Sequence, residues 1–174
     1  NINWYRSTVL YMEKLGLQEP VLDLGSGLGF FVEACLLNGM ECTGIELSEY
    51  GVQKAKERFP GISIIQKDLA EELPFKNDSF KSVVINQVID HLTHDDGINV
   101  LKESYRVLSD DGKLFIYSGC RYNKKEANDP EHLFLYTPTL LKKTLNDIGF
   151  DKVKHLDTPL PVLGHNFFSK RIMN

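Results

Sequence analysis

A glycine-rich turn preceded by a carboxylate is the feature of this sequence that most directly suggests chemistry. Glycines occupy alternate positions in Gly25-Ser26-Gly27-Leu28-Gly29, directly after the short apolar run Val21-Leu22-Asp23-Leu24. Because glycine has no Cβ, its backbone can turn tightly and approach a ligand where any other residue would clash. The spacing predicts a loop that holds a ligand at the end of a first strand. The alternative is a tight strand-to-helix turn without a ligand.

Two further acids follow the glycine turn at intervals that suit a nucleoside. Glu46 ends a second predicted strand about 20 residues on, the usual place for a carboxylate that accepts both ribose hydroxyls. Asp68 follows a third strand, where it can accept from an exocyclic adenine amine, and Leu69 can add a backbone amide and an apolar wall. Taken alone, Asp68 would be interpreted as a helix cap or turn residue. The three features together favour a bound nucleoside.

Short apolar runs alternate along the chain with longer segments of helical periodicity. Strands are predicted at 21–24, 42–45, 62–66, 82–86, 113–118 and 152–156, and helices at 4–15, 30–37, 48–58, 96–107 and 138–148. Strands that alternate with helices imply parallel pairing and right-handed crossovers. The predicted fold class is therefore α/β, with a doubly wound, mostly parallel, Rossmann-like sheet in three αβα layers.

The end of the chain does not continue this alternation. Phe167, Phe168 and Ile172 follow helical spacing better than strand alternation, so a loop at 158–165 and a helix at 166–174 are predicted. In that case an antiparallel closing strand is expected beyond residue 174, in a chain truncated at its C-terminus. The first residue is Asn rather than Met, which is also typical of a piece of a longer chain.

Composition limits the class of protein. The 174 residues, 42% of them hydrophobic, are enough for one domain with its own core, spanning 1–174. A net charge of −4 without a basic cluster argues against a nucleic-acid partner. Three cysteines without a C-x-x-C pair suit a reducing compartment, and neither a membrane-length apolar run nor a signal peptide is visible, so a cytoplasmic location is expected.

From Pro20 to Phe150 the chain resembles the class I S-adenosylmethionine-dependent methyltransferases, and closely their type 11 small-molecule group. Five ordered motifs carry the resemblance: the glycine loop, Gly44-Ile45-Glu46-Leu47-Ser48, the segment from Leu73-Pro74-Phe75 to Asp78-Ser79-Phe80, Val88-Ile89-Asp90-His91-Leu92, and Arg106-Val107-Leu108-Ser109-Asp110-Asp111-Gly112. The chain departs from the family at Lys81, where Asp is usual, and at Asp111-Gly112, where Gly-Gly is usual. Neither position normally touches the cofactor.

The resemblance implies S-adenosyl-L-methionine as cofactor and an in-line displacement at its methyl group. Asp23 would lie near the ammonium group of the methionine portion, and the helix that starts after Gly29 would face its carboxylate. Asn86 and Gln87 would face the methionine portion or the acceptor. The implied cofactor-binding set is Asp23, Gly25, Ser26, Gly27, Gly29, Phe30, Glu46, Leu47, Asp68, Leu69, Asn86 and Gln87.

Residues for the methyl acceptor are expected in two loops at the same end of the sheet. The run from His132 to Pro138 is similar to a lid segment of many family members, so 119–137 is expected to cover the acceptor side. His132 or Tyr136 would take the acceptor proton or orient the acceptor. His91 is better interpreted as a structural residue. No metal site is expected, because His94 beside Asp95 and Asp96 is more typical of a solvated helix cap.

The predicted activity is methyl transfer to a small-molecule, lipid or glycan-precursor acceptor, by a monomer or a dimer. An Asn-Pro-Pro-Tyr motif of the kind that holds a flipped base is absent after the fourth predicted strand, which again argues against nucleic acid. Two alternatives stay open. A non-catalytic domain of the same fold would bind cofactor or a partner without turnover. A nicotinamide-dependent oxidoreductase is disfavoured by Phe30 at the third glycine position and by the lack of an obvious Tyr-x-x-x-Lys pair.

Overall fold

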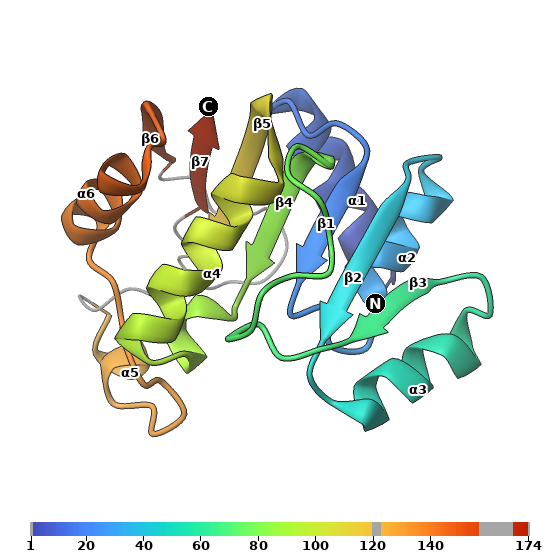
Figure 1. Ribbon diagram of the computed structural model, residues 1–174. Coiled ribbons are helices and arrows are strands. Elements are labelled where there is room, and N and C mark those ends of the chain that lie inside the picture. Colours follow the sequence, from blue (N-terminus) through green and yellow to red (C-terminus); the bar gives the residue numbers. More distant parts are fainter. Residues whose placement is uncertain (1, 120–122, 157–168, 174) are drawn as a thin grey trace.

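A computed structural model describes residues 2–119, 123–156 and 169–173 of the chain (Figure 1). Seven strands of this part form one sheet, in the order β3-β2-β1-β4-β5-β7-β6. Their bounds are Val21–Leu24 (β1), Cys42–Glu46 (β2), Ser63–Gln66 (β3), Phe80–Asn86 (β4), Leu108–Tyr117 (β5), Lys152–Leu156 (β6) and Ser169–Met173 (β7). Strands β1 to β5 pair in parallel, whereas β7 is antiparallel to both of its neighbours. The doubly wound, mostly parallel sheet predicted from sequence is confirmed.

The prediction for the end of the chain is wrong. Residues 169–173 form β7 between β5 and β6 instead of a helix, so the antiparallel closing strand lies within the chain and not beyond it. Inserting a strand between two others satisfies its backbone groups on both sides, a gain that side-chain periodicity does not report. Phe167, Phe168 and the predicted loop at 158–165 lie outside the described residues.

Helices cover both faces of the sheet, which gives the three expected layers (Figure 1). Helices α4 (His94–Val107) and α6 (Pro138–Ile148) pack on one face, and α1 (Ile2–Lys14), α2 (Phe30–Leu37) and α3 (Glu49–Arg58) on the other. The short α5 (Lys124–Ala127) and the 3-10 turn η1 (Ile89–His91) lie where the parallel strands end. Loops and short helical turns therefore surround the carboxyl-terminal end of the parallel strands.

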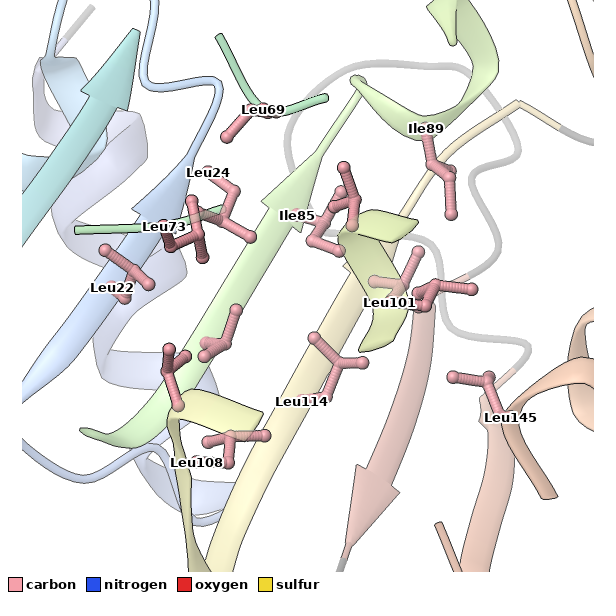
Figure 2. Packing of buried hydrophobic residues seen from close by; sticks show 14 of the residues in the cluster. Leu22, Leu24, Leu69, Leu73, Ile85, Ile89, Leu101, Leu108, Leu114 and Leu145 are labelled. Carbon is pink, nitrogen blue, oxygen red and sulfur yellow. The ribbon is translucent and has the colours of Figure 1, made fainter. Parts of the chain in front are cut away.

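The core beneath α4 and α6 fixes the central strands (Figure 2). All four residues of β1 are buried, and so is the run of β4 from Ser82 to Ile85, as a strand covered on both faces requires. Leu101 of α4 and Leu145 of α6 are fully buried in the same cluster as Leu114 of β5. Burying each such side chain contributes about 1.5–3 kcal/mol, so the strand ends are held on a rigid base.

Register aligns the ends of the strands at one edge. Leu24 at the end of β1 lies opposite Ile45 of β2 and Ile85 of β4, and Glu46 lies opposite Gln66 of β3. The residues that follow these positions therefore emerge side by side. In open α/β sheets, ligands bind at this carboxyl-terminal edge, where the strand order reverses about the first strand.

Candidate functional site

The glycine loop adopts a conformation that only glycine takes up easily. Gly25 and Gly29 have φ angles of +75° and +73°, in the left-handed region. A Cβ on Gly25 would stand 2.3 Å from Cγ2 of Val88, and one on Gly29 would stand 2.7 Å from Cδ1 of Ile62. The loop is thus pressed against the segment after β4 on one side and against β3 on the other. At Gly27, also at positive φ, a Cβ would enter open space.

Glu46 is oriented toward this loop by two backbone amides. The Gly27 amide donates to Glu46 Oε2 at 2.7 Å, and the Ser48 amide donates to Oε1 at 2.8 Å. Ser48 itself caps α3, because its hydroxyl accepts from the Gly51 amide. A carboxylate oxygen can accept more than one hydrogen bond, so both oxygens keep acceptor capacity for a ligand. The structure therefore adds a fixed orientation that the sequence did not reveal.

Asp23 is an acid buried beneath the loop. Its side chain is 2% exposed. Burial, and second the negative charge of Glu46, raise the pKa of the Asp23 carboxyl to about 7. The carboxylate of Asp23 also contributes, after burial, to the raised pKa of Tyr5 on α1. A cation placed beside Asp23 would favour its charged form, so this residue suits an ammonium-bearing ligand.

The aromatic residues of α1 pack around the start of α2. The rings of Tyr5 and Phe30 are stacked at 5.5 Å, and the Arg58 guanidinium lies 3.8 Å from the centre of the Phe30 ring. Trp4 meets Tyr5 edge to face at 4.6 Å. The Phe30 side chain is thus engaged by protein groups, and a ligand would meet it through its backbone amide in the first turn of α2.

Two residues expected near an adenine differ in exposure. Leu47 follows Glu46 with 62% of its surface exposed, whereas Leu69 is 7% exposed and belongs to the core. Asp68 Oδ1 accepts from the Ala70 amide at 2.9 Å, so the turn role considered from sequence is present.

The end of β4 carries an unusual backbone. Gln87 has a φ of +54°, and its amide donates to the carbonyl of Tyr117 at 2.6 Å. Its side-chain Nε2 is buried and makes no hydrogen bond, and the same is true of Ser26 Oγ in the glycine loop. Buried polar atoms are normally satisfied, so two such atoms at one edge indicate where a polar ligand would complete the structure. Asn86, the last residue of β4, adjoins them.

A second group of polar residues joins η1 to the segment after β5. His132 Nδ1 donates to the carbonyl of Glu126 at 2.8 Å, and His132 Nε2 lies 3.6 Å from Asp90 Oδ2. Asp90 is 1% exposed, and its Oδ2 accepts from the Gly119 amide at 2.9 Å. The Asp90 carbonyl accepts from the Leu133 amide. Asp90 therefore attaches this segment to the sheet, a role that its place in the motif before His91 did not disclose.

The charge environment of His132 is mixed. Burial lowers the pKa of the imidazole, but the hydrogen bond with Glu126 and the charges of Asp90, Asp129 and Glu126 outweigh it, and the pKa is raised. A hollow of about 320 Å³ lies beside this residue, lined by Ala127, His132, Leu133, Phe134 and Leu135. The position is open enough to receive a small group of an acceptor.

Tyr136 and His94 lie in a different environment from that of His132. Tyr136 is 3% exposed in the core, its hydroxyl makes no hydrogen bond, and burial raises its pKa. A Cβ on Gly97 of α4 would stand 3.1 Å from that hydroxyl. The His94 ring packs on Phe134 at 4.4 Å. Tyr122, within the 119–137 segment expected to cover the acceptor side, lies outside the described residues.

The described residues form an α/β domain whose glycine loop, Asp23 and Glu46 lie at the carboxyl edge of a mostly parallel sheet. A sequence model of the methyltransferase domain family matches residues 22–116 of this chain. The chain belongs to this family and, within it, to the class I S-adenosylmethionine-dependent methyltransferases of type 11, as the resemblance implied. S-adenosylmethionine is the cofactor of this family.

Individual relatives agree with this assignment. Phthiotriol/phenolphthiotriol dimycocerosates methyltransferase of Mycobacterium tuberculosis is 32% identical over 129 residues, which is 73% of this chain and 46% of that protein. Sterol 24-C-methyltransferase of Pneumocystis carinii is 32% identical over 123 residues, 66% of this chain and 31% of that protein. The chain thus spans about half, or less, of the length of these relatives.

Solved structures show the same fold. A methyltransferase from Archaeoglobus fulgidus superposes with a TM-score of 0.81 at 19% identity, over 100% of this chain and 95% of that one. Phosphoethanolamine N-methyltransferase 2 of Haemonchus contortus, solved in complex with S-adenosyl-L-methionine, gives 0.73 at 18% identity, over 87% of this chain and 38% of that one. Among the described helices, none has the length and apolar character needed to cross a membrane.

Proposed function

We propose that this domain transfers a methyl group from S-adenosyl-L-methionine to a small-molecule, lipid or glycan-precursor acceptor. The observation that carries the proposal is the Glu46 carboxylate, fixed by the amides of Gly27 and Ser48 at the carboxyl edge of the sheet. Bound there, the cofactor supplies an electrophilic methyl group on a sulfonium. A cytoplasmic location belongs to the same proposal, and the free thiols of Cys35 and Cys42 are consistent with it.

The residues at this edge fit the chemical groups of that cofactor. Glu46 would accept from the two ribose hydroxyls, and the exposed Leu47 would contact the base. The second oxygen of Asp68 would accept from the adenine amine, and Leu69 would contribute its backbone. These groups together bind one nucleoside, which agrees with the open space beside Gly27.

The methionine end of the cofactor would face the glycine loop. The first amides of α2, beginning at Phe30, offer donors and a positive dipole to a carboxylate. Asp23 offers the opposite charge to an ammonium group, which would offset the cost of ionising a buried acid. The unpartnered Gln87 Nε2 and Ser26 Oγ would gain hydrogen bonds, and Asn86 would face the same portion or the acceptor.

Catalysis in this reaction is chiefly alignment in a pocket that excludes water, since the leaving group is already good. Segment 123–137 supplies the cover on the acceptor side, held to the sheet through Asp90. His132 lies beside the hollow and orients the acceptor or receives its proton, whereas the Tyr136 hydroxyl is enclosed against α4. A His132→Ala variant with unchanged turnover on the true acceptor would remove that role.

Calorimetric titration distinguishes this function from its two alternatives. We expect S-adenosylmethionine and S-adenosylhomocysteine to bind with micromolar affinity and NADH not to bind. Glu46→Ala should lose this binding, whereas Glu49→Ala, an exposed acid in the first turn of α3, should keep it. Binding of NADH alone would favour the oxidoreductase.

The acceptor class needs a separate measurement. Cofactor labelled in the methyl group is incubated with the chain and either an aqueous metabolite extract or a lipid extract, and incorporated label is counted in each. Label in one extract identifies the acceptor class. Tight cofactor binding with label in neither extract, at any enzyme concentration, would favour the non-catalytic domain.

A further inference from the structure

Three side chains capable of binding a metal converge where η1 meets the segment after β5. Asp90 and His91 come from η1, and His132 comes from beyond α5. One ligand atom from each of the three lies within 4.8 Å of the others. This group differs from the run at His94, Asp95 and Asp96, whose residues are more typical of a solvated helix cap.

Both imidazoles direct Nδ1 toward a backbone carbonyl, which leaves Nε2 available to a metal. His132 Nδ1 contacts the Glu126 carbonyl at 2.8 Å, and His91 Nδ1 contacts the Glu131 carbonyl at 3.1 Å. Because a carbonyl oxygen only accepts, each Nδ1 must carry the proton, and in a neutral ring each Nε2 presents a lone pair. Histidine ligands of metals are commonly oriented in this way, with the second nitrogen donating to a backbone carbonyl.

Asp90 supplies a buried carboxylate with unused acceptor capacity. Its residue is 1% exposed, and its Oδ1 has no hydrogen-bond partner. Its Oδ2, which accepts from the Gly119 amide, lies 3.6 Å from His132 Nε2. When the His132 ring is neutral, its Nε2 lone pair faces this carboxylate oxygen, and the two repel. Either a proton on Nε2 or a metal ion between the two atoms removes this repulsion.

The separations suit a tetrahedral ion. Nitrogen and oxygen ligands lie about 2.0–2.1 Å from Zn²⁺, so two of them at the tetrahedral angle are roughly 3.4 Å apart. The distance between Asp90 Oδ2 and His132 Nε2 is 3.6 Å. The third ligand, His91, is exposed, and its ligand atom lies within 4.8 Å of the other two.

We propose that Asp90, His91 and His132 bind one divalent transition-metal ion of the zinc type. Imidazole nitrogen favours Zn²⁺ and its neighbours in the first transition row over Mg²⁺ or Ca²⁺. Three protein ligands leave a fourth position open, beside the hollow that His132 lines. The ion would link the end of β4 to the segment that covers the acceptor side. The inference does not depend on the proposed methyl transfer. With the ion bound, His132 would only help to orient the acceptor, because its Nε2 would be a ligand and could not take up a proton.

Metal-free chain titrated with Zn²⁺ and with Co²⁺ tests this site. We expect one ion per chain, a visible Co²⁺ absorption band of tetrahedral intensity, and a higher unfolding temperature with metal. His132→Gln and His91→Gln should each weaken binding at least tenfold, since each removes one of three protein ligands. His94→Gln, an exposed histidine outside the group, should bind like the unaltered chain.

The outcomes are separable even if one variant fails to fold. His91 is exposed, so His91→Gln is expected to keep the circular dichroism spectrum of the unaltered chain, and it then carries the test alone. Absence of binding to the unaltered chain would overturn the proposal. Binding that both variants retain, or that His94→Gln loses, would overturn it as well, because the ion would then be held elsewhere.

Discussion

The buried acid beneath the glycine loop should make the stability of the cofactor-free domain fall as the pH rises. The pKa of Asp23 is raised from 3.8 to about 7 in the folded chain, first by burial and second by Glu46. The folded state therefore holds this proton more tightly than the unfolded state does. The resulting stabilisation is complete at pH values below the pKa of Asp23 in the unfolded chain. It is lost as the pH rises through about 7, the pKa in the folded chain.

The size of the effect follows from the same two pKa values. Over the whole titration the difference corresponds to about 4 kcal/mol, and between about pH 5 and about pH 8 to roughly 3 kcal/mol. Asp23→Asn has nearly the same shape and does not titrate. The variant should therefore gain stability relative to the unaltered chain as the pH rises, by up to this amount.

Urea unfolding at these two pH values, without cofactor, measures the difference directly. The contributions of the other titrating groups are common to variant and unaltered chain, so they cancel in the difference between the two free energies of unfolding. Glu49→Gln, on the exposed start of α3, serves as the matched control. A stability difference between Asp23→Asn and the unaltered chain that does not change with pH would contradict this prediction. It would show that the Asp23 carboxyl is not held in an environment that disfavours its charge.

Three other substitutions test the loop, the core and the enclosed tyrosine. Gly25→Ala would place a Cβ 2.3 Å from Val88 at a positive φ. We therefore expect the free energy of unfolding in urea to fall by about 1–3 kcal/mol and cofactor binding to weaken. An unchanged free energy and affinity would show that the loop can adjust its backbone without cost. Leu101→Ala removes a fully buried side chain beneath α4 and should cost about 2–5 kcal/mol by the same assay, a result that a much smaller loss would contradict. Tyr136→Phe removes a buried hydroxyl without a partner and should stabilise the chain by roughly 1 kcal/mol while methyl transfer continues; loss of turnover would instead assign Tyr136 a catalytic role.

The sheet could be predicted because the signals that define it are local. Runs such as 21–24 and 82–85 are buried on both faces, and the turns between strands and helices carry glycine, proline or capping residues. The position of the closing strand could not be predicted. Residues 169–173 are stabilised by pairing with β6 and with β5, the second of which lies far from them in sequence, so local periodicity predicted a helix instead.

The candidate site was predictable in its residues more than in its contacts. Glu46 could be named from its distance after the glycine turn, but its hydrogen bonds with Gly27 and Ser48 depend on how two loops meet. The grouping of Asp90 with His132 joins positions 42 residues apart through the fold, and nothing in their spacing along the chain reports it. Sequence indicates which chemistry is available, whereas tertiary contacts decide which groups share a site.

The most direct test of the account is a crystal structure of this chain with S-adenosylhomocysteine. We predict the ligand at the carboxyl edge of the sheet, with both ribose hydroxyls donating to the Glu46 carboxylate and the amino group near Asp23. The Gly27 and Ser48 amides should still donate to Glu46, as they do here. Electron density for the ligand at another place, or a Glu46 carboxylate turned away from the ribose, would contradict the account.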